Sequence, residues 1–133
     1  MAKIKHIAIR TADPEKTAAF YMSVFELEEV GKAGSGVYLS DGYINLAILK
    51  STDQSTGESP RDISGYAGID HLGFLVDDVD VTSKKLEDEG ASSLGRLDLS
   101  HQQPAGGKSY YEIKYRGPDN QVIDISGAGW IGT

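Results

Sequence analysis

The sequence contains no cysteine and no long apolar run. Without cysteine, disulfides and thiolate metal ligands are excluded, which leaves His, Asp, Glu and Asn as candidate ligands. No apolar stretch approaches the 18 residues that a membrane-spanning helix needs, and the first residues do not read as a signal peptide. We therefore expect a cytoplasmic protein with no membrane partner.

Positive charge is also scarce, since 13 Lys and Arg face 20 Asp and Glu, for a net charge of −7. Binding to nucleic acid or to an anionic membrane needs clustered basic residues, so neither partner is expected. A chain of 133 residues is most simply one domain, and it can bury roughly two thirds of its unfolded surface. The expected partner is a small molecule.

The first part of the chain alternates like a strand and then becomes helical. Residues 4–11 place His6, Ala8 and Arg10 on one face of a strand. Asp13 is a good N-cap and Pro14 suits the first helical position. The predicted helix runs to about Leu27, with an apolar stripe of Phe20, Val24 and Leu27 that Tyr21 and Phe25 widen. Further strands are predicted at 28–32, 36–40 and 43–49, the last two joined by the turn residues Asp41 and Gly42.

The same order of elements then repeats after a polar stretch. Residues 50–66, rich in Ser, Gly and Pro, are the predicted linker. A strand at 69–76 leads to a helix capped by Asp77 or Asp78, which ends before Gly90. Strands at 93–99, 110–115 and 122–126 complete the second unit. The single domain thus divides into a first repeat at 3–49, the linker at 50–66, a second repeat at 67–127 and a tail at 128–133.

The two βαβββ units carry polar residues at matching strand positions. "KHIAIRT" and "DHLGFLV" place His6 and His71 alike in the first strand of each unit, and the last strands, "YINLAI" and "VIDIS", match Asn45 with Asp124. Units of this kind pair about a local two-fold axis. We therefore predict an α+β fold, a cupped mixed sheet with the helices on its outer face and these four side chains in one cavity.

Two imidazoles and a carboxylate suit a borderline divalent metal such as Fe²⁺, Mn²⁺, Ni²⁺ or Zn²⁺, and leave coordination positions open. His6, His71 and Asp124 are the candidate metal ligands. Asn45 could add a neutral carbonyl oxygen, bind a ligand water or line the pocket as a substrate-binding residue.

The segments "KHIAIRTADPEKTAAFY", "GIDHLGFLVDD" and "YRGPDNQVIDI" resemble the vicinal oxygen chelate superfamily over residues 3–126. That group includes glyoxalases, extradiol dioxygenases, methylmalonyl-CoA epimerases, fosfomycin-resistance thiol transferases and bleomycin-resistance proteins. The resemblance implies a glyoxalase-like fold, a homodimer, and metal ligands at His6, His71 and Asp124, with Asn45 at the fourth place. It also implies a metal-dependent enzyme that chelates a small oxygen-rich molecule, with dioxygenase-like or lyase/isomerase-like chemistry.

Three positions depart from the patterns common in that superfamily. Asp124 stands where many members have the longer Glu, and Asn45 replaces a Glu of glyoxalases and cannot act as a general base. The tyrosine of the extradiol signature falls on Lys114. A metal-free protein that sequesters a small molecule, as bleomycin-resistance proteins do, is therefore an alternative function, and a fosfomycin-type thiol transferase is a further one.

Several residues outside the ligand set are candidates for the site. His101, in "SHQQPAGGKS", and Tyr115 are candidate catalytic residues, while Arg10 and Tyr111 join Asn45 as candidate substrate-binding residues. Trp130, in the tail, is expected to anchor it on the surface or on a partner subunit.

Overall fold

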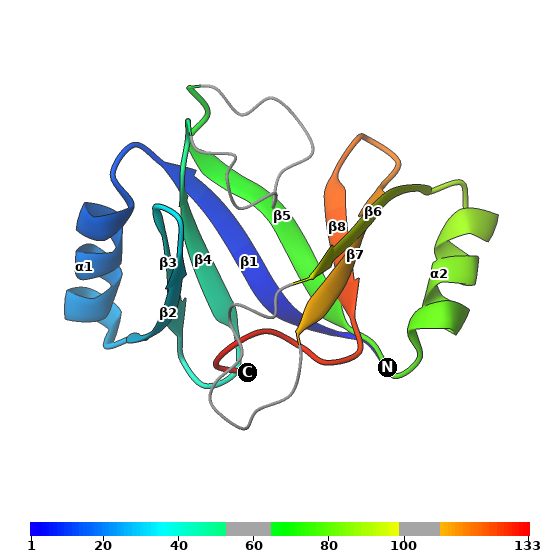
Figure 1. Ribbon diagram of the computed structural model, residues 1–133, viewed down its shortest axis with the longest axis horizontal. Coiled ribbons are helices and arrows are strands. Elements are labelled where there is room, and N and C mark those ends of the chain that lie inside the picture. Colours follow the sequence, from blue (N-terminus) through cyan, green and yellow to red (C-terminus); the bar gives the residue numbers. More distant parts are fainter. Residues whose placement is uncertain (53–64, 99–109) are drawn as a thin grey trace.

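The computed structural model describes residues 1–52, 65–98 and 110–133. In this part of the chain the element order is βαβββ–βαβββ (Figure 1). The elements are β1 (Lys3–Thr11), α1 (Pro14–Phe25), β2 (Glu28–Ala33), β3 (Gly36–Ser40), β4 (Asn45–Lys50), β5 (Gly68–Leu75), α2 (Val79–Asp88), β6 (Ser92–Asp98), β7 (Tyr111–Arg116) and β8 (Val122–Ser126). The described part contains no helix that is both long enough and apolar enough to span a membrane.

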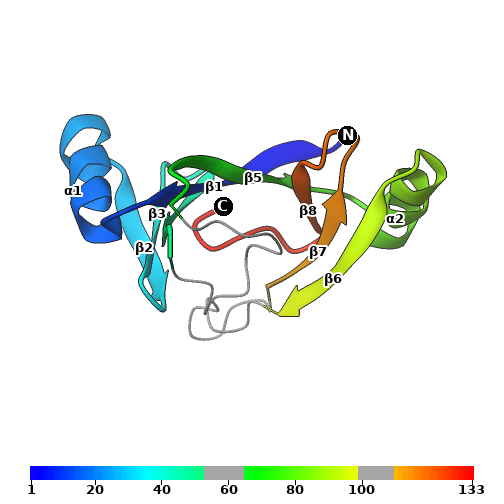
Figure 2. The ribbon, with the colours of Figure 1, turned by 90° about the horizontal axis from the view of Figure 1, so that it is seen from above.

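One mixed sheet contains all eight of these strands, in the order β2-β3-β4-β1-β5-β8-β7-β6. The first strands of the two units, β1 and β5, pair antiparallel at its centre, and each pairs in parallel with the last strand of its own unit, β4 or β8. The sheet curves into a cup, and α1 and α2 lie outside it at opposite ends (Figure 2). The predicted α+β fold, a cupped mixed sheet with the helices on its outer side, is confirmed.

The strand register places His6, Asn45 and Asp124 in a single row across the sheet, with His71 two positions away along β5. His6 is opposite Asn45 on one side and Gly73 on the other. Gly73 is in turn opposite Asp124, which is opposite Lys114. Side chains that face each other across paired strands lie about 5 Å apart at Cβ. The register alone therefore brings the matched positions of the two units to the middle of the cup.

Helix α1 begins as predicted and ends earlier than predicted. The Asp13 carboxylate accepts a hydrogen bond from the Lys16 N–H, and Pro14 occupies the first turn. Glu26 adopts a left-handed conformation (φ 59°) and its N–H bonds to the Met22 carbonyl, which closes the helix before Leu27. Leu27 then packs into the core as part of the following segment.

The side of α1 that faces the sheet differs from the predicted apolar stripe. Ala18 is buried, and Tyr21 and Met22 pack with it against a core formed by Val37, Leu39 and Ile48. Three members of the stripe are instead more than half exposed: Phe20, Val24 and Phe25. The helix therefore carries apolar side chains on two sides, only one of which contacts its own sheet.

Helix α2 is capped by Asp78 rather than Asp77, since the Asp78 carboxylate accepts a hydrogen bond from the Val81 N–H. Gly90 follows the helix with a positive φ of 90°, as predicted for a residue just past its end. The outer face of the second unit forms a small core around Val76, Tyr115 and Ile125.

The boundary of β4 shows why strand ends were predicted less accurately than strand identities. The predicted strand begins at 43, whereas β4 begins at Asn45. The Asp41 carboxylate accepts hydrogen bonds from the Tyr43 and Ile44 N–H groups, so these two residues belong to the turn.

The C-terminal tail corrects the prediction made for Trp130. Residues after β8 turn back across the concave side of the sheet (Figure 2), and Trp130 is fully buried inside the cup. Gly73 leaves the space for it, because a Cβ at position 73 would lie 2.7 Å from Cζ2 of Trp130. The tail therefore fills the concave side of the sheet beside His6 and Gly73.

Candidate metal centre

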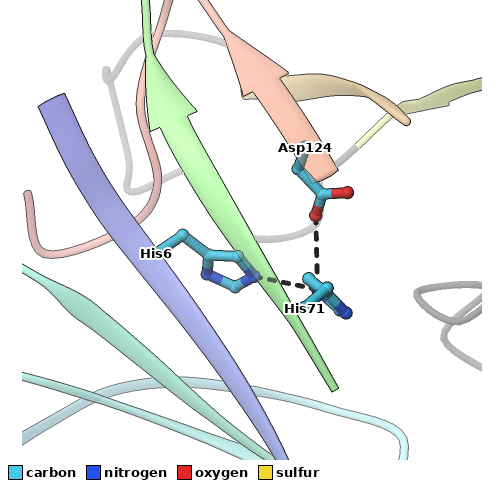
Figure 3. A group of neighbouring side chains, drawn as sticks. All are labelled: His6, His71 and Asp124. Carbon is cyan, nitrogen blue, oxygen red and sulfur yellow. Dashed lines mark hydrogen bonds and ion pairs between the residues drawn. The ribbon is translucent and has the colours of Figure 1, made fainter. Parts of the chain in front are cut away.

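His6 is oriented by a chain of hydrogen bonds that begins in the tail. The Asn45 Nδ2 donates to the Ile131 carbonyl at 2.9 Å, so its Oδ1 is the acceptor for His6 Nδ1, 2.8 Å away. Because Nδ1 carries the proton in this arrangement, the Nε2 of neutral His6 keeps a free lone pair. That lone pair points toward His71 (Figure 3).

His71 is oriented in the same way by a carboxylate. Its Nδ1 lies 3.2 Å from Oδ2 of Asp70, and the same oxygen accepts a hydrogen bond from Arg10 Nε at 3.1 Å. A carboxylate can only accept, so His71 Nδ1 is the donor and Nε2 is the bare nitrogen. A carboxylate behind the distal ring nitrogen is the usual arrangement that fixes the tautomer of a metal-binding histidine.

Three unprotonated atoms converge in the cup as a result. The two Nε2 atoms lie 3.2 Å apart, and Oδ2 of Asp124 lies 3.2 Å from His71 Nε2 (Figure 3). One ligand atom from each of these three residues falls within 4.8 Å of the others, and all three residues are at most 2% exposed. Lone pairs this close repel one another unless a cation or a proton lies among them.

The spacing of these atoms agrees with ligation of one metal ion. Two nitrogens about 2.1 Å from the same ion are about 3.0 Å apart at a right angle and about 3.4 Å apart at a tetrahedral angle. The observed 3.2 Å between the imidazole nitrogens lies between these values. Two imidazoles and a carboxylate also form a donor set that borderline divalent metals favour.

Beyond Asp124 the cup contains a buried ion-pair network. Lys114 Nζ lies 3.0 Å from each carboxylate oxygen of Asp124 and 2.8 Å from Oε1 of Glu112. The other oxygen of Glu112 accepts a hydrogen bond from the indole Nε1 of Trp130 at 2.8 Å. Asp124 therefore reaches the histidines and is shared between them and the lysine.

Among the described residues of this buried cluster, carboxylates outnumber basic side chains. Arg10 and Lys114 supply two positive charges, against three carboxylates from Asp70, Glu112 and Asp124. Carboxylate oxygens are ligands for divalent cations, so the described residues give this cluster an acidic character that suits such an ion.

The local electrostatics keep both histidines neutral. Burial, and next the neighbouring His71, lower the pKa of His6 from 6.5 to about 3. Burial, and next the Lys114 ammonium, lower the pKa of His71 as well. Neutral imidazole is the form that binds metal, so both side chains are ready ligands at neutral pH.

The comparisons with known proteins agree with this picture. A model of the "Glyoxalase/Bleomycin resistance protein/Dioxygenase superfamily" matches residues 3–124. The chain belongs to this superfamily. No curated protein gives a significant match to it.

Solved structures of superfamily folds resemble the chain at low sequence identity. The Mn(II)-bound glyoxalase from Novosphingobium aromaticivorans has a TM-score of 0.70, with 17% identity over 96% of this chain and 40% of that one. Methylmalonyl-CoA epimerase from Mycobacterium tuberculosis has a TM-score of 0.63 and 15% identity, covering 92% of this chain and 85% of that one. The 2,3-dioxygenase LapB from Pseudomonas sp. KL28 has a TM-score of 0.66 and 21% identity, covering 98% and 42%. These likenesses establish the fold.

Two other predicted site residues, Asn45 and Arg10, also lie at the candidate metal centre. Asn45 is fully buried and positions His6 through its amide oxygen. Arg10 is also buried; it pairs with Asp70 and donates to the Lys50 carbonyl at 3.1 Å. In this structure both side chains act on the histidines, directly or through Asp70.

The two tyrosines predicted for the site lie elsewhere. Tyr115 packs on the helix side of the sheet and its hydroxyl donates to Glu87 at 3.3 Å. Tyr111 stacks beneath Arg96, whose guanidinium carbon lies 4.1 Å from the ring centroid. Both tyrosines occupy odd-numbered positions of β7. These positions face away from the cup because side chains alternate along a strand. His101 lies outside the described residues.

Four residues that shape the centre were not predicted as part of it: Asp70, Glu112, Lys114 and Trp130. The sequence held one signal for two of them, since the spacing of Glu112 and Lys114 puts both side chains on one face of a strand. In the structure this strand pairs with β8, where Lys114 is opposite Asp124. No pattern in the sequence indicated that Trp130 would fold back into the cup.

Proposed function

We propose that this superfamily member is a metal-dependent enzyme that acts on a small oxygen-rich molecule. The single observation that carries the proposal is the convergence of three possible ligand atoms, the Nε2 atoms of His6 and His71 and Oδ2 of Asp124, within 4.8 Å of one another at a buried position. His6, His71 and Asp124 would hold the ion. A divalent ion at this position supplies a Lewis acid that stabilises negative charge on two neighbouring oxygens of a chelated molecule.

The protein contributes to this chemistry by orienting the ligand side chains and by burying them away from water. Asn45 and Asp70 fix the two imidazole rings, and Lys114 holds the carboxylate of Asp124. Three protein ligands would leave coordination positions open, at which a substrate could place two oxygens. Mn(II) in the similar glyoxalase from Novosphingobium aromaticivorans supports a divalent cofactor, although Fe²⁺, Ni²⁺ and Zn²⁺ suit the same donors.

A metal titration tests this assignment. We expect one equivalent of Mn²⁺, Co²⁺ or Zn²⁺ to bind per chain, and Asp124→Asn, which keeps the shape of the side chain, to weaken binding at least tenfold. His6→Ala should abolish it. Asp119→Asn is the matched control, because Asp119 is an exposed turn residue. Equal metal affinity in Asp124→Asn, His6→Ala and the control contradicts the ligand assignment.

The second part of the proposal, chelation of two neighbouring oxygens, needs its own probe. Oxalate presents two adjacent carboxylate oxygens and can be titrated into the metal-loaded protein by calorimetry. We expect oxalate to bind the loaded protein and not the chelator-treated one. If oxalate binds neither form while the metal titration succeeds, the site holds an ion without open positions and the enzymatic proposal is wrong.

The alternative, a metal-free protein that sequesters a small molecule, is favoured by one specific observation. Lys114 already supplies a positive charge to both oxygens of Asp124, so part of the role of a metal is filled from within the chain. Thermal unfolding separates the two functions, because a metal that binds only the native state raises the melting temperature. An unchanged melting temperature with every divalent ion tried, starting from chelator-treated protein, supports this alternative.

A further inference from the structure

The space that Trp130 fills has the features of a ligand site. The tail at residues 127–133 crosses the concave side of the sheet (Figure 2), and the indole lies parallel to the His6 ring, with centroids 4.9 Å apart and an angle of 7°. Stacking of this kind recognises a flat π-system with little regard for its identity. We call the space that the Trp130 indole fills the slot. One wall of the slot is the His6 imidazole, which is also part of the candidate metal centre.

The floor of the slot is a position without a side chain. A Cβ at Gly73 would lie 2.7 Å from one indole carbon, 2.8 Å from another and 2.8 Å from the Cβ of His6. Gly73 does not have a positive φ, so backbone conformation does not require glycine there. The close approach of a flat ring is the reason for glycine at this place in β5.

The third feature is a directional acceptor. Glu112 is 1% exposed, and its Oε2 accepts the indole N–H at 2.8 Å. Burial opposes ionisation of this side chain, but the Lys114 ammonium together with smaller contributions from His6 and His71 lowers the pKa of Glu112 to about 2. The slot thus ends at a buried carboxylate oxygen, Oε2 of Glu112. Any molecule in the slot should donate a hydrogen bond to this oxygen, since a buried acceptor without a donor is strongly unfavourable.

Polar contacts between described residues attach the tail that delivers Trp130 to the cup. Asn45 Nδ2 bonds to the Ile131 carbonyl, and Ser40 Oγ bonds to the Gly132 carbonyl at 2.8 Å. Two glycines of the tail, Gly129 and Gly132, have positive φ values of 81° and 85°. Each bond to the sheet is one that water can replace when the tail moves away.

We propose that this slot is a binding site for a planar aromatic ring that carries an N–H or O–H donor, and that Trp130 occupies it as an internal ligand that such a molecule displaces. The proposal deepens the proposed function, because a ring in the slot lies against His6 and defines the substrate class of the centre. Recognition by the stacking wall, the glycine floor and the Glu112 acceptor does not itself depend on a metal, so every test below uses chelator-treated protein.

The first test empties the slot. In Trp130→Ala, free indole should bind by calorimetry at least tenfold more tightly than 1-methylindole, which has the same shape but no N–H to give to Glu112. Indole should also recover part of the melting temperature lost on truncation. Equal binding of the two probes, or binding of neither by a folded variant, overturns the proposal.

The second test uses the unaltered protein, so it stands even where the truncated variant does not fold. Trp130 is the single tryptophan, and its fluorescence reports the position of the tail. Phenol, which carries a donor, should raise the acrylamide quenching of Trp130 severalfold, whereas anisole, which carries none, should not. Trp130→Phe weakens the internal ligand and should bind phenol more tightly than the parent does.

The outcomes of these tests are separate from those of the metal experiments. If phenol leaves Trp130 protected, and Trp130→Phe binds it no better than the parent does, the tail is a fixed structural element and the slot is no binding site. The metal titration would be unaffected by that result. Failure of the metal titration, in turn, would leave the binding of phenol and indole to the slot unchanged.

Discussion

At the scale of single residues, Lys114 determines how strongly the carboxylate of Asp124 can interact with a metal ion at the histidines. Its ammonium contacts both oxygens of Asp124 and one of Glu112 inside the cup. Burial would lower the pKa of Lys114, but the two carboxylates outweigh burial and raise it above its ordinary value. The lysine is therefore a permanent cation that competes with a metal ion for the same oxygen atoms.

Replacement of this lysine should change metal affinity and stability in opposite directions. We expect Lys114→Met to tighten divalent metal binding by about tenfold or more, since a unit charge a few ångströms away is worth at least about 1.4 kcal/mol. The metal-free variant should lose about 3–5 kcal/mol of unfolding free energy, because two buried carboxylates lose their partner. Calorimetry and urea unfolding measure the two effects.

The control for this variant is Lys84→Met, which removes an exposed lysine paired with Asp88 at 2.9 Å. An exposed pair four residues apart on a helix contributes about 0.3–0.5 kcal/mol. Metal binding that weakens in Lys114→Met would show that the lysine supports the site instead of competing in it.

The neutral, buried histidines predict how acid affects the metal-free protein. The unfolded chain binds a proton at His6 near pH 6.5, whereas the folded chain does not until about pH 3. Protons therefore favour the unfolded state, and this stability is complete above pH 6.5 and declines as the pH falls toward 3. Urea unfolding between pH 7 and 5 should show a loss of up to about 1.4 kcal/mol per pH unit for each such histidine. A free energy that is constant over this range, or that rises as the pH falls, contradicts the neutral burial of His6.

At the scale of elements, the sequence predicted most of what positions the site. Strand alternation placed His6, His71 and Asp124 on one face of their strands, and the repeat paired the first and last strand of each unit. These features depend on local periodicity, which a single sequence contains. The side chains that complete the centre do not, because Asp70, Glu112 and Trp130 acquire their roles only through contacts between distant elements.

Strand β5 offers a prediction about the floor of the slot. Gly73→Ala should place a methyl group against both Trp130 and His6, and overpacking of this kind destabilises by about 1–3 kcal/mol. The indole should be forced outward, which shifts the Trp130 emission to longer wavelength. Gly31→Ala in β2 is the control, since its new Cβ would meet its nearest neighbours at 3.4 and 3.5 Å, ordinary contact distances. Unchanged emission in Gly73→Ala would mean that the ring does not need this space.

At the scale of the whole molecule, the outer surface of α1 carries an aromatic cluster that its own sheet does not cover. Phe20 and Phe25 are 55% and 59% exposed and contact each other edge to face at a centroid distance of 6.2 Å. Contiguous apolar surface of this kind is typical of protein contacts. We propose that a second copy of the chain covers it, which gives the homodimer expected from the sequence.

Sedimentation or light scattering tests this proposal directly. The protein should have twice the mass of one chain at micromolar concentration, and Phe20→Ser combined with Phe25→Ser should produce a monomer that remains folded. A parent protein that is monomeric at all accessible concentrations would contradict the proposed dimer, and it would leave the metal centre intact, because the described ligands come from one chain.

The proposed function depends most on two imidazoles, those of His6 and His71, binding one cation. Copper binds such nitrogen sites more tightly than other divalent ions of its row, and pulsed electron paramagnetic resonance counts bound imidazoles through their remote nitrogens. With one equivalent of Cu²⁺ per chain, we predict two imidazoles in the parent and in His101→Ala, and one in His6→Ala or His71→Ala. A count of one or none in the parent would contradict the central claim.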